Sequence, residues 1–574
     1  MPALIESPPT VAARPAVVQD RVPVAHLALL AGLCALTLFI ALGSTPLWEP
    51  DEPRFAAATR QMLRSGDYLD PVFNGRPRWE KPILLYWLQA VPLALGVDEE
   101  LAMRLPAAVL GTAAVICVYA LGVFWWSPRA GLLAAALLAT TFRFVTYARQ
   151  GLTDVPALAG IVATFLTFEI GSRPERSTRQ RAAWWTGWTL VGLTALTKGP
   201  LALIAPTIWI AATSIRRREA IRWTAIASGA ALALLAGGSW FVYMTAHRGG
   251  AFVGVNSYEF VQRYFDRSFP GPSRGPLFYL SILPGEIAPW PLVAAAAVVV
   301  LLRCWKELDR RSQDGAIIAA AWFAGVMVLC SLSHYKLPHY ILPAYPPLML
   351  IAGAAIDRAW RVDAMRRVIA ASMAITAVVF IAAGAASTLA VFRLPDAFQW
   401  GAAAIGIACL IGGVTGIALL RRDPVVAPVA LAAATALGYG AAAALLLPTL
   451  ALEAYPYPWL GRQVAEKTTP SVALGSIGAH TALVYYADRP VTFLVTASEA
   501  ARFLSSRDPR LVVLSRSEFD SVQRIGPFAK ELAARRRGQN PRLSRLLEGR
   551  LLQSGTEELL VGNAAAAAVY SSGN

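Results

Sequence analysis

Long apolar segments constrain this chain more than any other feature of its sequence. About thirteen of them precede residue 448, and most approach the roughly 20 residues that a helix needs to cross a bilayer. The chain is 56% hydrophobic and only 15% charged, which excludes a large soluble protein. We therefore expect a polytopic α-helical membrane protein with about 13 transmembrane helices. They are predicted at 24–43, 103–125, 129–148, 154–171, 184–198, 200–215, 223–246, 286–303, 315–332, 341–357, 368–391, 398–420 and 425–447.

Basic residues cluster in alternate loops between these segments. The positive-inside rule places such loops in the cytoplasm. The loops 44–102 and 247–285, and everything after residue 448, then lie in the periplasm. The same distribution explains the net charge of +16, so we expect no nucleic-acid partner. The clusters are Arg173 to Arg181, Arg216 to Arg222, Arg303 to Arg311, Arg358 to Arg367, and Arg421 with Arg422.

Composition divides the chain into three parts. Residues 1–23 are rich in Pro and Ala and are expected to form a cytoplasmic tail. Residues 24–448 form the transmembrane domain, and residues 449–574 are expected to form a periplasmic α/β domain. Strands are predicted there at 472–475, 490–495, 510–514 and 558–561, and helices at 459–467, 498–505 and 518–525.

The first periplasmic loop, 44–102, carries far more charge than the rest of this apolar chain. One helix is predicted from Pro53 to about Ser65, where Gly66 ends it. A second, from Pro82 to about Leu95, is too short to span and is expected to lie along the membrane interface. A dense polar loop at a membrane surface suits chemistry on the head group of an amphiphile.

The charged residues of this loop admit two interpretations. Asp51 and Glu52 stand where acidic side chains cap a helix and complement its dipole, but they also share the loop with Arg54, Glu80 and Lys81, as catalytic groups would. Lys81 either extends its ammonium to the membrane interface or binds a phosphate.

Further cations and a tyrosine are predicted at the same membrane face. They are Arg263, Arg267, Lys336 and Tyr340, and their convergence indicates an anionic head group. The Gly- and Pro-rich run 269–276 is expected to be a flexible loop that closes over the site.

No metal or cofactor is required by these patterns. His334 and His339 are five residues apart, which is loose for a metal pair on one helix, so a divalent cation shared with Glu80 is left only as an alternative. For Asp154 with Arg149, and for Lys198, the default interpretations are a structural ion pair and a helix end. The five cysteines lie in or beside apolar segments without CxxC spacing and are expected to be unpaired.

Five motifs together resemble those of the bacterial aminoarabinose transferases. They are WEPDEPR after the first apolar segment, then RWEKPILLYWLQ, ARQGLTDVPAL, LTKGP and HYKLPHYILPAYP. Those enzymes belong to the GT-C membrane glycosyltransferases, which also include the protein O-mannosyltransferases. The resemblance implies the GT-C fold. Relatives often have a His between the residues that are Glu259 and Arg263 here; this chain has Phe260, so no role of that His is carried over.

The resemblance implies transfer of 4-amino-4-deoxy-L-arabinose from undecaprenyl phosphate to a lipid A phosphate, on the periplasmic side of the bacterial inner membrane. The expected partners are that donor, lipid A or its precursor, and membrane lipids, with the chain a monomer. Asp51 and Glu52 are the expected catalytic residues. A phosphate acceptor is already anionic and needs no base, whereas for a hydroxyl acceptor Asp51 would act as one. The expected substrate-binding residues are Arg54, Glu80, Lys81, Arg263, Arg267, Lys336 and Tyr340.

Other functions fit the sequence less well. Within the enzymes, the alternative is transfer of another sugar, or transfer to a protein Ser or Thr. A transporter or flippase typically shows inverted repeats and polar groups at mid-membrane, and the sequence shows neither. A sensor with a periplasmic binding domain would leave the charges of the first loop without a purpose.

Overall fold

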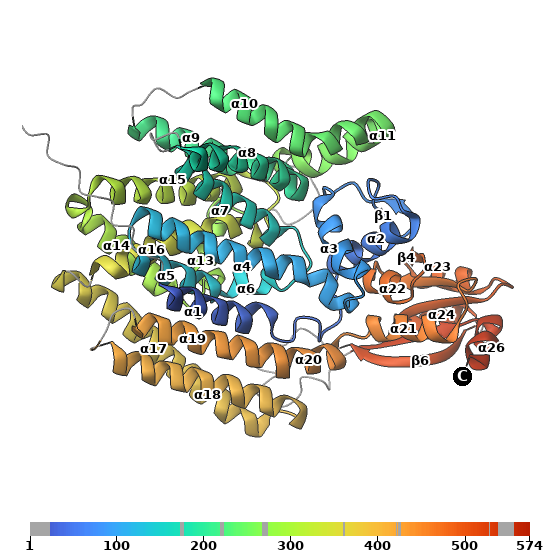
Figure 1. Cartoon of the computed structure of the whole chain (residues 1–574). Coiled ribbons are helices and arrows are strands. Elements are labelled where there is room, and N and C mark those ends of the chain that lie inside the picture. Colours follow the sequence, from blue (N-terminus) through green and yellow to red (C-terminus); the bar gives the residue numbers. More distant parts are fainter. Residues whose placement is uncertain are drawn as a thin grey trace, which may run out of the picture.

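Roughly aligned helices form the body of the protein, and a small sheet domain lies at one end of them (Figure 1). The structure is a computed structural model that describes residues 23–172, 177–217, 223–266, 274–359, 362–420, 422, 426–526, 529–537 and 556–573. The predicted tail up to residue 22 lies outside the described residues. So do several cations of the predicted cytoplasmic loops, namely Arg173, Arg176, Arg218, Arg222, Arg361 and Arg421.

The helices of the body begin and end largely where the apolar segments do. Ser127 caps α5, whose first residue is Pro128, and Ser177 with Gln180 forms a capping box at the start of α8. The α-helices are α1 (Val24–Cys34), α4 (Glu99–Trp125), α5 (Pro128–Ala139), α6 (Phe142–Ala148), α7 (Asp154–Gly171), α8 (Thr178–Lys198), α9 (Ile204–Arg217), α10 (Trp223–Ala233), α11 (Ser239–Ser257), α12 (Arg263–Phe265), α13 (Phe278–Glu286), α14 (Pro291–Arg303), α15 (Arg310–Leu332), α16 (Tyr345–Ala359), α17 (Asp363–Ala390), α18 (Asp396–Leu419), α19 (Val426–Ala441) and α20 (Leu447–Ala454). Short 3-10 or π segments continue them at η1 (Ala35–Phe39), η2 (Gly199–Leu203), η3 (Leu234–Gly238), η4 (Tyr258–Gln262), η5 (Trp305–Glu307), η6 (Pro338–Ala344), η7 (Val391–Arg393) and η8 (Ala442–Leu446).

In the described part of the chain, fewer helices than the expected thirteen are long enough to span a membrane. Among the described residues, 9 helices are long and apolar enough to cross a membrane, or 11 if each of two bent pairs is one span. One difference is α1 with η1, which together (Val24–Phe39) fall short of the 18 residues required for that count. The chain is thus a multi-pass membrane protein.

The other difference is the pair α8 and α9, which that count takes as one helix of 37 residues. The backbone breaks at Gly199, where φ is 57° and ψ is −130°. The ring centroids of Trp184 on α8 and Trp209 on α9 are 5.9 Å apart. A straight helix would separate residues so far apart in sequence by about 37 Å. The two helices therefore run antiparallel, as two shorter segments.

The first loop folds between the helix ends and the sheet domain (Figure 1). Both predicted helices are confirmed: α2 (Glu52–Ser65) ends at Gly66, whose φ is 72°, and α3 (Leu84–Ala94) follows a short antiparallel pair, β1 (Val72–Phe73) and β2 (Arg76–Pro77). The rings of Phe55 on α2 and Tyr86 on α3 are 5.1 Å apart, and both side chains are buried. This packing fixes the polar residues that precede each helix.

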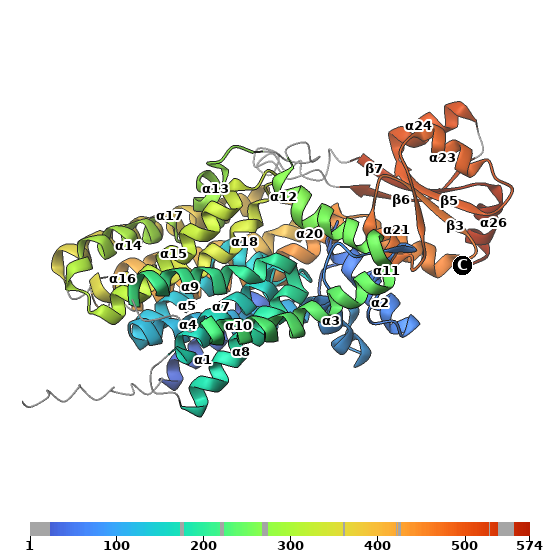
Figure 2. The ribbon, with the colours of Figure 1, turned by 90° about the horizontal axis from the view of Figure 1, so that it is seen from above.

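The sheet domain contains one mixed sheet with strand order β4-β3-β5-β7-β6, seen from above in Figure 2. All the predicted strands and helices are confirmed, but β6, α22 and α26 were not predicted. β6 was missed because its sequence is highly charged and lacks the usual strand pattern. It forms an edge of the sheet, where charged side chains are favoured. The elements are α21 (Tyr457–Lys467), β3 (Ala473–Ile477), α22 (Thr481–Tyr486), β4 (Val491–Leu494), α23 (Ala497–Leu504), β5 (Arg510–Ser515), α24 (Arg516–Ile525), β6 (Lys530–Arg537), β7 (Thr556–Gly562) and α26 (Ala564–Ser572).

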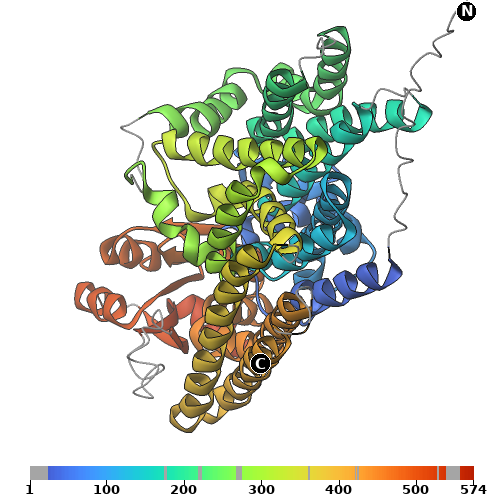
Figure 3. The ribbon, with the colours of Figure 1, turned by 90° about the vertical axis from the view of Figure 1, so that its left-hand side faces the viewer.

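Polar contacts fasten the sheet domain to the first loop. Arg60 on α2 donates to Glu99 at 2.5 Å and to Asp488 at 3.2 Å. Its guanidinium lies 3.9 Å from the ring centroid of Tyr485. Asn74 exchanges two hydrogen bonds with the backbone of Val491. The sheet domain therefore holds the loop from the side away from the helices. Figure 3 shows the molecule from the end that lies opposite the sheet domain.

Candidate active site

A buried ion pair anchors the start of α2. The carboxylate of Glu52 accepts from Nε and Nη2 of Arg104, both at 2.9 Å, and from the backbone N–H groups of Trp48 and Gly151, both at 2.8 Å. Only 1% of the Glu52 side chain is exposed. These bonds join α2, α4 and the turn before α7, so Glu52 holds its neighbour Asp51 in place.

Asp51 occupies the N-cap position of α2, yet its side chain makes no capping hydrogen bond. The carboxylate is 49% exposed and lies 3.6 Å from Nη1 of Arg54. It is also within electrostatic range of Tyr147 and His339. The capping interpretation is therefore not supported by this geometry, and the carboxylate is available at the surface of the loop.

Lys81 joins the first loop to the segment after α11. Its ammonium forms a short ion pair with Glu259 of η4, and Nη1 of Arg263 bonds both oxygens of the same carboxylate at 2.7 and 2.8 Å. Burial lowers the pKa of Lys81 from its ordinary value, and Glu259 opposes that shift. A single carboxylate thus holds two cations together.

A second polar group adjoins this one. Lys198, the last residue of α8, pairs with Asp154, the first residue of α7, at 2.5 Å. His339 places Nε2 at 3.7 Å from Asp154 and Nδ1 at 2.7 Å from the hydroxyl of Tyr147. The ring of Tyr340, beside Lys198, and the ring of Tyr335, beside Arg263, have centroids 6.4 Å apart, so the two groups adjoin.

Aromatic rings complete the cationic side of the site. The Arg263 guanidinium lies 4.0 Å from the ring centroid of Tyr335, and the Lys198 ammonium lies 5.7 Å from that of Tyr340. Three cations surround these rings but only two carboxylates do. The cations are Lys81, Lys198 and Arg263, and the carboxylates are Glu259 and Asp154. The excess of positive charge in a partly buried place favours an anion with several oxygens, such as a phosphate.

The structure brings together most of the residues predicted for the site. Asp51, Arg54, Glu80, Lys81, Arg263 and Tyr340 lie in one region. Lys336 is buried, and its ammonium donates to the carbonyl of Ser333 within its own turn. Arg267, and the part of the predicted closing loop up to residue 273, lie outside the described residues.

Glu259 and Tyr147 were not among the residues predicted for the site, and Asp154 and Lys198 were expected to have only structural roles. The signal that identifies them is their chemical type, because ionisable groups inside or at the ends of apolar segments are rare and mark functional sites. Asp154 and Lys198 do form the predicted kind of ion pair, but with each other.

The alternative metal site is not formed by the described residues. Among them, no group of three or more His, Cys, Asp or Glu side chains is placed to hold a metal ion. The backbone N–H of His334 donates to the carbonyl of Tyr264 at 3.0 Å, while the His339 ring faces Tyr147 and Asp154.

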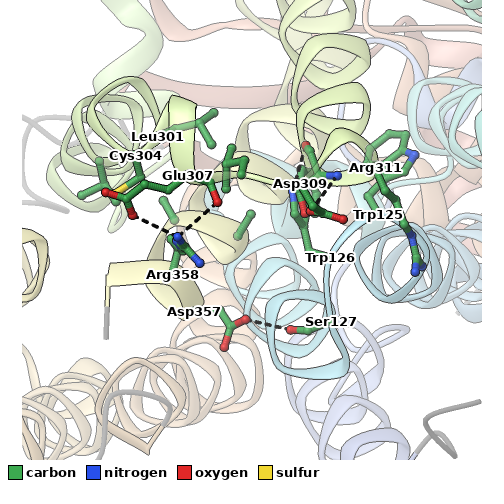
Figure 4. A pocket seen from close by; sticks show the side chains of 15 residues that line it. Trp125, Trp126, Ser127, Leu301, Cys304, Glu307, Asp309, Arg311, Asp357 and Arg358 are labelled. Atoms are coloured by element: carbon green, nitrogen blue, oxygen red, sulfur yellow. Dashed lines mark hydrogen bonds and ion pairs between the residues drawn. The ribbon is translucent and has the colours of Figure 1, made fainter. Parts of the chain in front are cut away.

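A cavity of about 340 Å³ lies at the other end of the helices (Figure 4). It is lined by the ends of α4, α14 and α16 and by the start of α15. Two polar contacts lie in its lining: Arg358 pairs with Glu307 at 2.9 Å, and Ser127 donates to Asp357 at 2.9 Å. These bonds tie the basic loops together, and none of the predicted site residues lines the cavity.

Comparison with known proteins points to one group of enzymes. The family model described as dolichyl-phosphate-mannose-protein mannosyltransferase matches residues 80–241. An undecaprenyl phosphate-alpha-4-amino-4-deoxy-L-arabinose arabinosyl transferase of Pseudomonas fluorescens is 27% identical over 521 residues, covering 88% of this chain and 85% of the relative. One from Pseudomonas aeruginosa is 30% identical over 340 residues, covering 56% and 58% respectively.

This chain is a homologue of the bacterial aminoarabinose transferases. Its fold matches the crystal structure of ArnT from Cupriavidus metallidurans bound to undecaprenyl phosphate, with a TM-score of 0.75, 20% identity, and coverage of 95% of this chain and 99% of that one. An oligosaccharyltransferase of Archaeoglobus fulgidus matches with a TM-score of 0.51 and 12% identity, covering 85% of this chain and 69% of that one.

The predicted fold class is thus confirmed: the chain has the GT-C type of membrane fold, with a C-terminal sheet domain. The predicted enzyme class is confirmed as well, since the names of these relatives and the matched family indicate a glycosyltransferase.

Proposed function

We propose that this glycosyltransferase moves 4-amino-4-deoxy-L-arabinose from undecaprenyl phosphate to a phosphate of lipid A. The observation that carries the proposal is the cluster of Lys81, Lys198 and Arg263 beside Tyr340. It is an anion site in a homologue of enzymes whose names specify an undecaprenyl phosphate donor. His339 interacts electrostatically with both Asp51 and Lys198, so Asp51 lies near the same cluster.

Lys81 and Arg263 bind the donor phosphate in this proposal. Both cations now share the carboxylate of Glu259, and a phosphate would bind them in competition with it. Negative charge grows on the phosphate as the bond to the sugar breaks. Fixed cations in a partly buried place stabilise that charge without reorganising.

Asp51 acts on the sugar side of the breaking bond. Glycosyl transfer passes through a state with oxocarbenium character, which a half-exposed carboxylate stabilises or orients. A phosphate acceptor needs no general base, because its second pKa is about 6. Glu52 was predicted to be catalytic; because its carboxylate is buried and fully bonded, we propose that it positions Asp51 instead.

The site faces the periplasm of the bacterial inner membrane in this proposal. Arg358 and Arg311 belong to basic loops that meet at the cavity end of the helices, opposite the sheet domain (Figure 1). The positive-inside rule assigns that end to the cytoplasm. The end with Lys81 and the sheet domain is then periplasmic, where lipid-linked donors of this kind are used.

Mass spectrometry of lipid A tests the proposal. Cells that produce the chain are expected to carry a pentosamine-sized addition that is absent without the chain and absent with Asp51→Asn. A hexose-sized addition, or a glycosylated protein, would instead support the alternative that the matched mannosyltransferase family suggests.

A further inference from the structure

Glu80 has a buried carboxylate oxygen with no hydrogen-bond partner in the described part of the chain. That atom is Oε2. A buried carboxylate oxygen without a donor is costly, and native proteins rarely retain one unless a ligand supplies the partner. The position lies within the active site rather than in the core, since Glu80 directly precedes Lys81.

Glu80 and Lys81 serve opposite sides of the site although they are neighbours in sequence. Lys81 pairs with Glu259, beside Arg263. Glu80 is within electrostatic range of Arg54 and Tyr86, and so is Asp51. The peptide between residues 80 and 81 therefore separates a cationic side from an acidic side.

Among the described residues, no cation forms an ion pair with the Glu80 carboxylate, and its Oε2 has no hydrogen-bond partner. Arg54 is the cation that faces it, and Arg54 lies 3.6 Å from Asp51, which balances its charge. Arg78 is a further cation near Arg54; its Nε donates to the hydroxyl of Tyr86 at 3.0 Å and its guanidinium lies 4.8 Å from the ring centroid of Phe55, and neither contact is to Glu80. Glu80 is thus a carboxylate whose direct partner is missing among the described residues, and a positively charged ligand would supply one.

We propose that Glu80 binds the ammonium group of the transferred sugar and so selects an amino sugar over a neutral one. This inference rests on the proposed function. With the donor phosphate on the Lys81 side, the sugar extends towards the Asp51 and Glu80 side. An ammonium there supplies the missing donor to Oε2, and a neutral hydroxyl replaces it with a weaker hydrogen bond.

The test compares two undecaprenyl phosphate donors that differ only at one position of the pentose, the 4-amino and the 4-hydroxy sugar. We expect the wild type to prefer the amino donor. Glu80→Gln is expected to lower kcat/KM for the amino donor by about 10- to 100-fold and to change the hydroxy donor little. Glu80→Asp, which keeps the charge, should retain part of the preference. Glu466→Gln, on the exposed face of α21, is the matched control and should leave both rates unchanged.

Three results overturn the inference. If Glu80→Gln lowered kcat/KM equally for both donors, Glu80 would be a structural residue. A loss that added divalent metal restores would assign Glu80 to a metal site. If the wild type itself transfers neither donor, the proposed function fails along with it, whereas failure of the Glu80 role alone appears only in the ratio between donors.

Discussion

Lys81 and Glu259 lie 178 residues apart in the sequence and form an ion pair in the site. A charge pair that is partly removed from water stays favourable only while both partners are present. In the proposed mechanism, the pairing keeps a cation at the site until an anionic ligand displaces Glu259. A role of Lys81 as an anchor at the membrane interface alone would not require this partner.

Replacing Lys81 tests this role directly. We expect Lys81→Ala to lower the transfer rate at least tenfold and Lys81→Arg to retain part of it, because charge is the main requirement although the planar guanidinium changes the geometry. The loss should appear in kcat if the contact strengthens as charge develops on the phosphate. The measurement is transfer rate against donor concentration in detergent.

The control for this experiment is Lys306→Ala, an exposed lysine at the other end of the helices, which should behave as wild type. Unchanged kcat and KM in Lys81→Ala would leave Arg263 and Lys198 as the cations of the phosphate site.

Asp51→Asn separates catalysis from helix capping. Asn is nearly as good an N-cap as Asp, and Asp51 makes no capping bond here, so folding and membrane insertion should be unaffected. Transfer should be abolished. Activity in isolated membranes and the thermal midpoint of the purified protein are the measurements.

Asp98→Asn is the matched control, because Asp98 does cap α4 through the N–H of Leu101 at 3.2 Å. It should keep near-normal activity. Normal transfer by Asp51→Asn would refute the catalytic role.

At the scale of elements, the break between α8 and η2 places Lys198 in the site. Gly199 has φ of 57° and ψ of −130°, and a Cβ there would approach the ring of Phe260 to 2.8 Å. Only glycine tolerates that backbone conformation and that contact together. The break thereby sets Lys198 against Asp154 while η4, which carries Glu259, packs alongside.

Gly199→Ala is expected to reduce the free energy of unfolding by about 1–3 kcal/mol and to lower transfer through displacement of η4. Thermal unfolding in detergent and the transfer rate measure the two effects. Gly438→Ala, in α19 with open space around the added Cβ, should leave transfer unchanged and be neutral or slightly stabilising. Equal behaviour of the two variants would contradict the role given to the break.

At the scale of the whole molecule, the arrangement predicts which parts of the chain share a side of the membrane. A reporter fused after Arg421 and one fused after Gly475 should report opposite sides, the first cytoplasmic and the second periplasmic. Reporter activity in intact cells is the measurement. The same side for both fusions would reverse the assignment of the site to the periplasm.

Sequence alone determined the class of the molecule and most of its elements. Apolar length fixes which segments are helices suited to a membrane, and Pro53 and Gly66 mark the limits of α2 closely. The sheet domain was predicted except for β6, α22 and α26. The strand β6 was missed because it carries charge in place of the alternating apolar pattern of a strand. Apolar length, Pro53 and Gly66 are local signals, so they can be recognised in one sequence.

The burial and the partners of the charged residues depend on the tertiary structure. Asp51 and Glu52 are adjacent and chemically alike, yet one is half exposed and the other is buried against Arg104. Lys81 meets Glu259, and Asp154 meets Lys198, through helices whose packing no local pattern specifies. Burial and pairing depend on positions set by side chains distant in sequence. For that reason the residue types of the site follow from the sequence, whereas their partners follow from the fold.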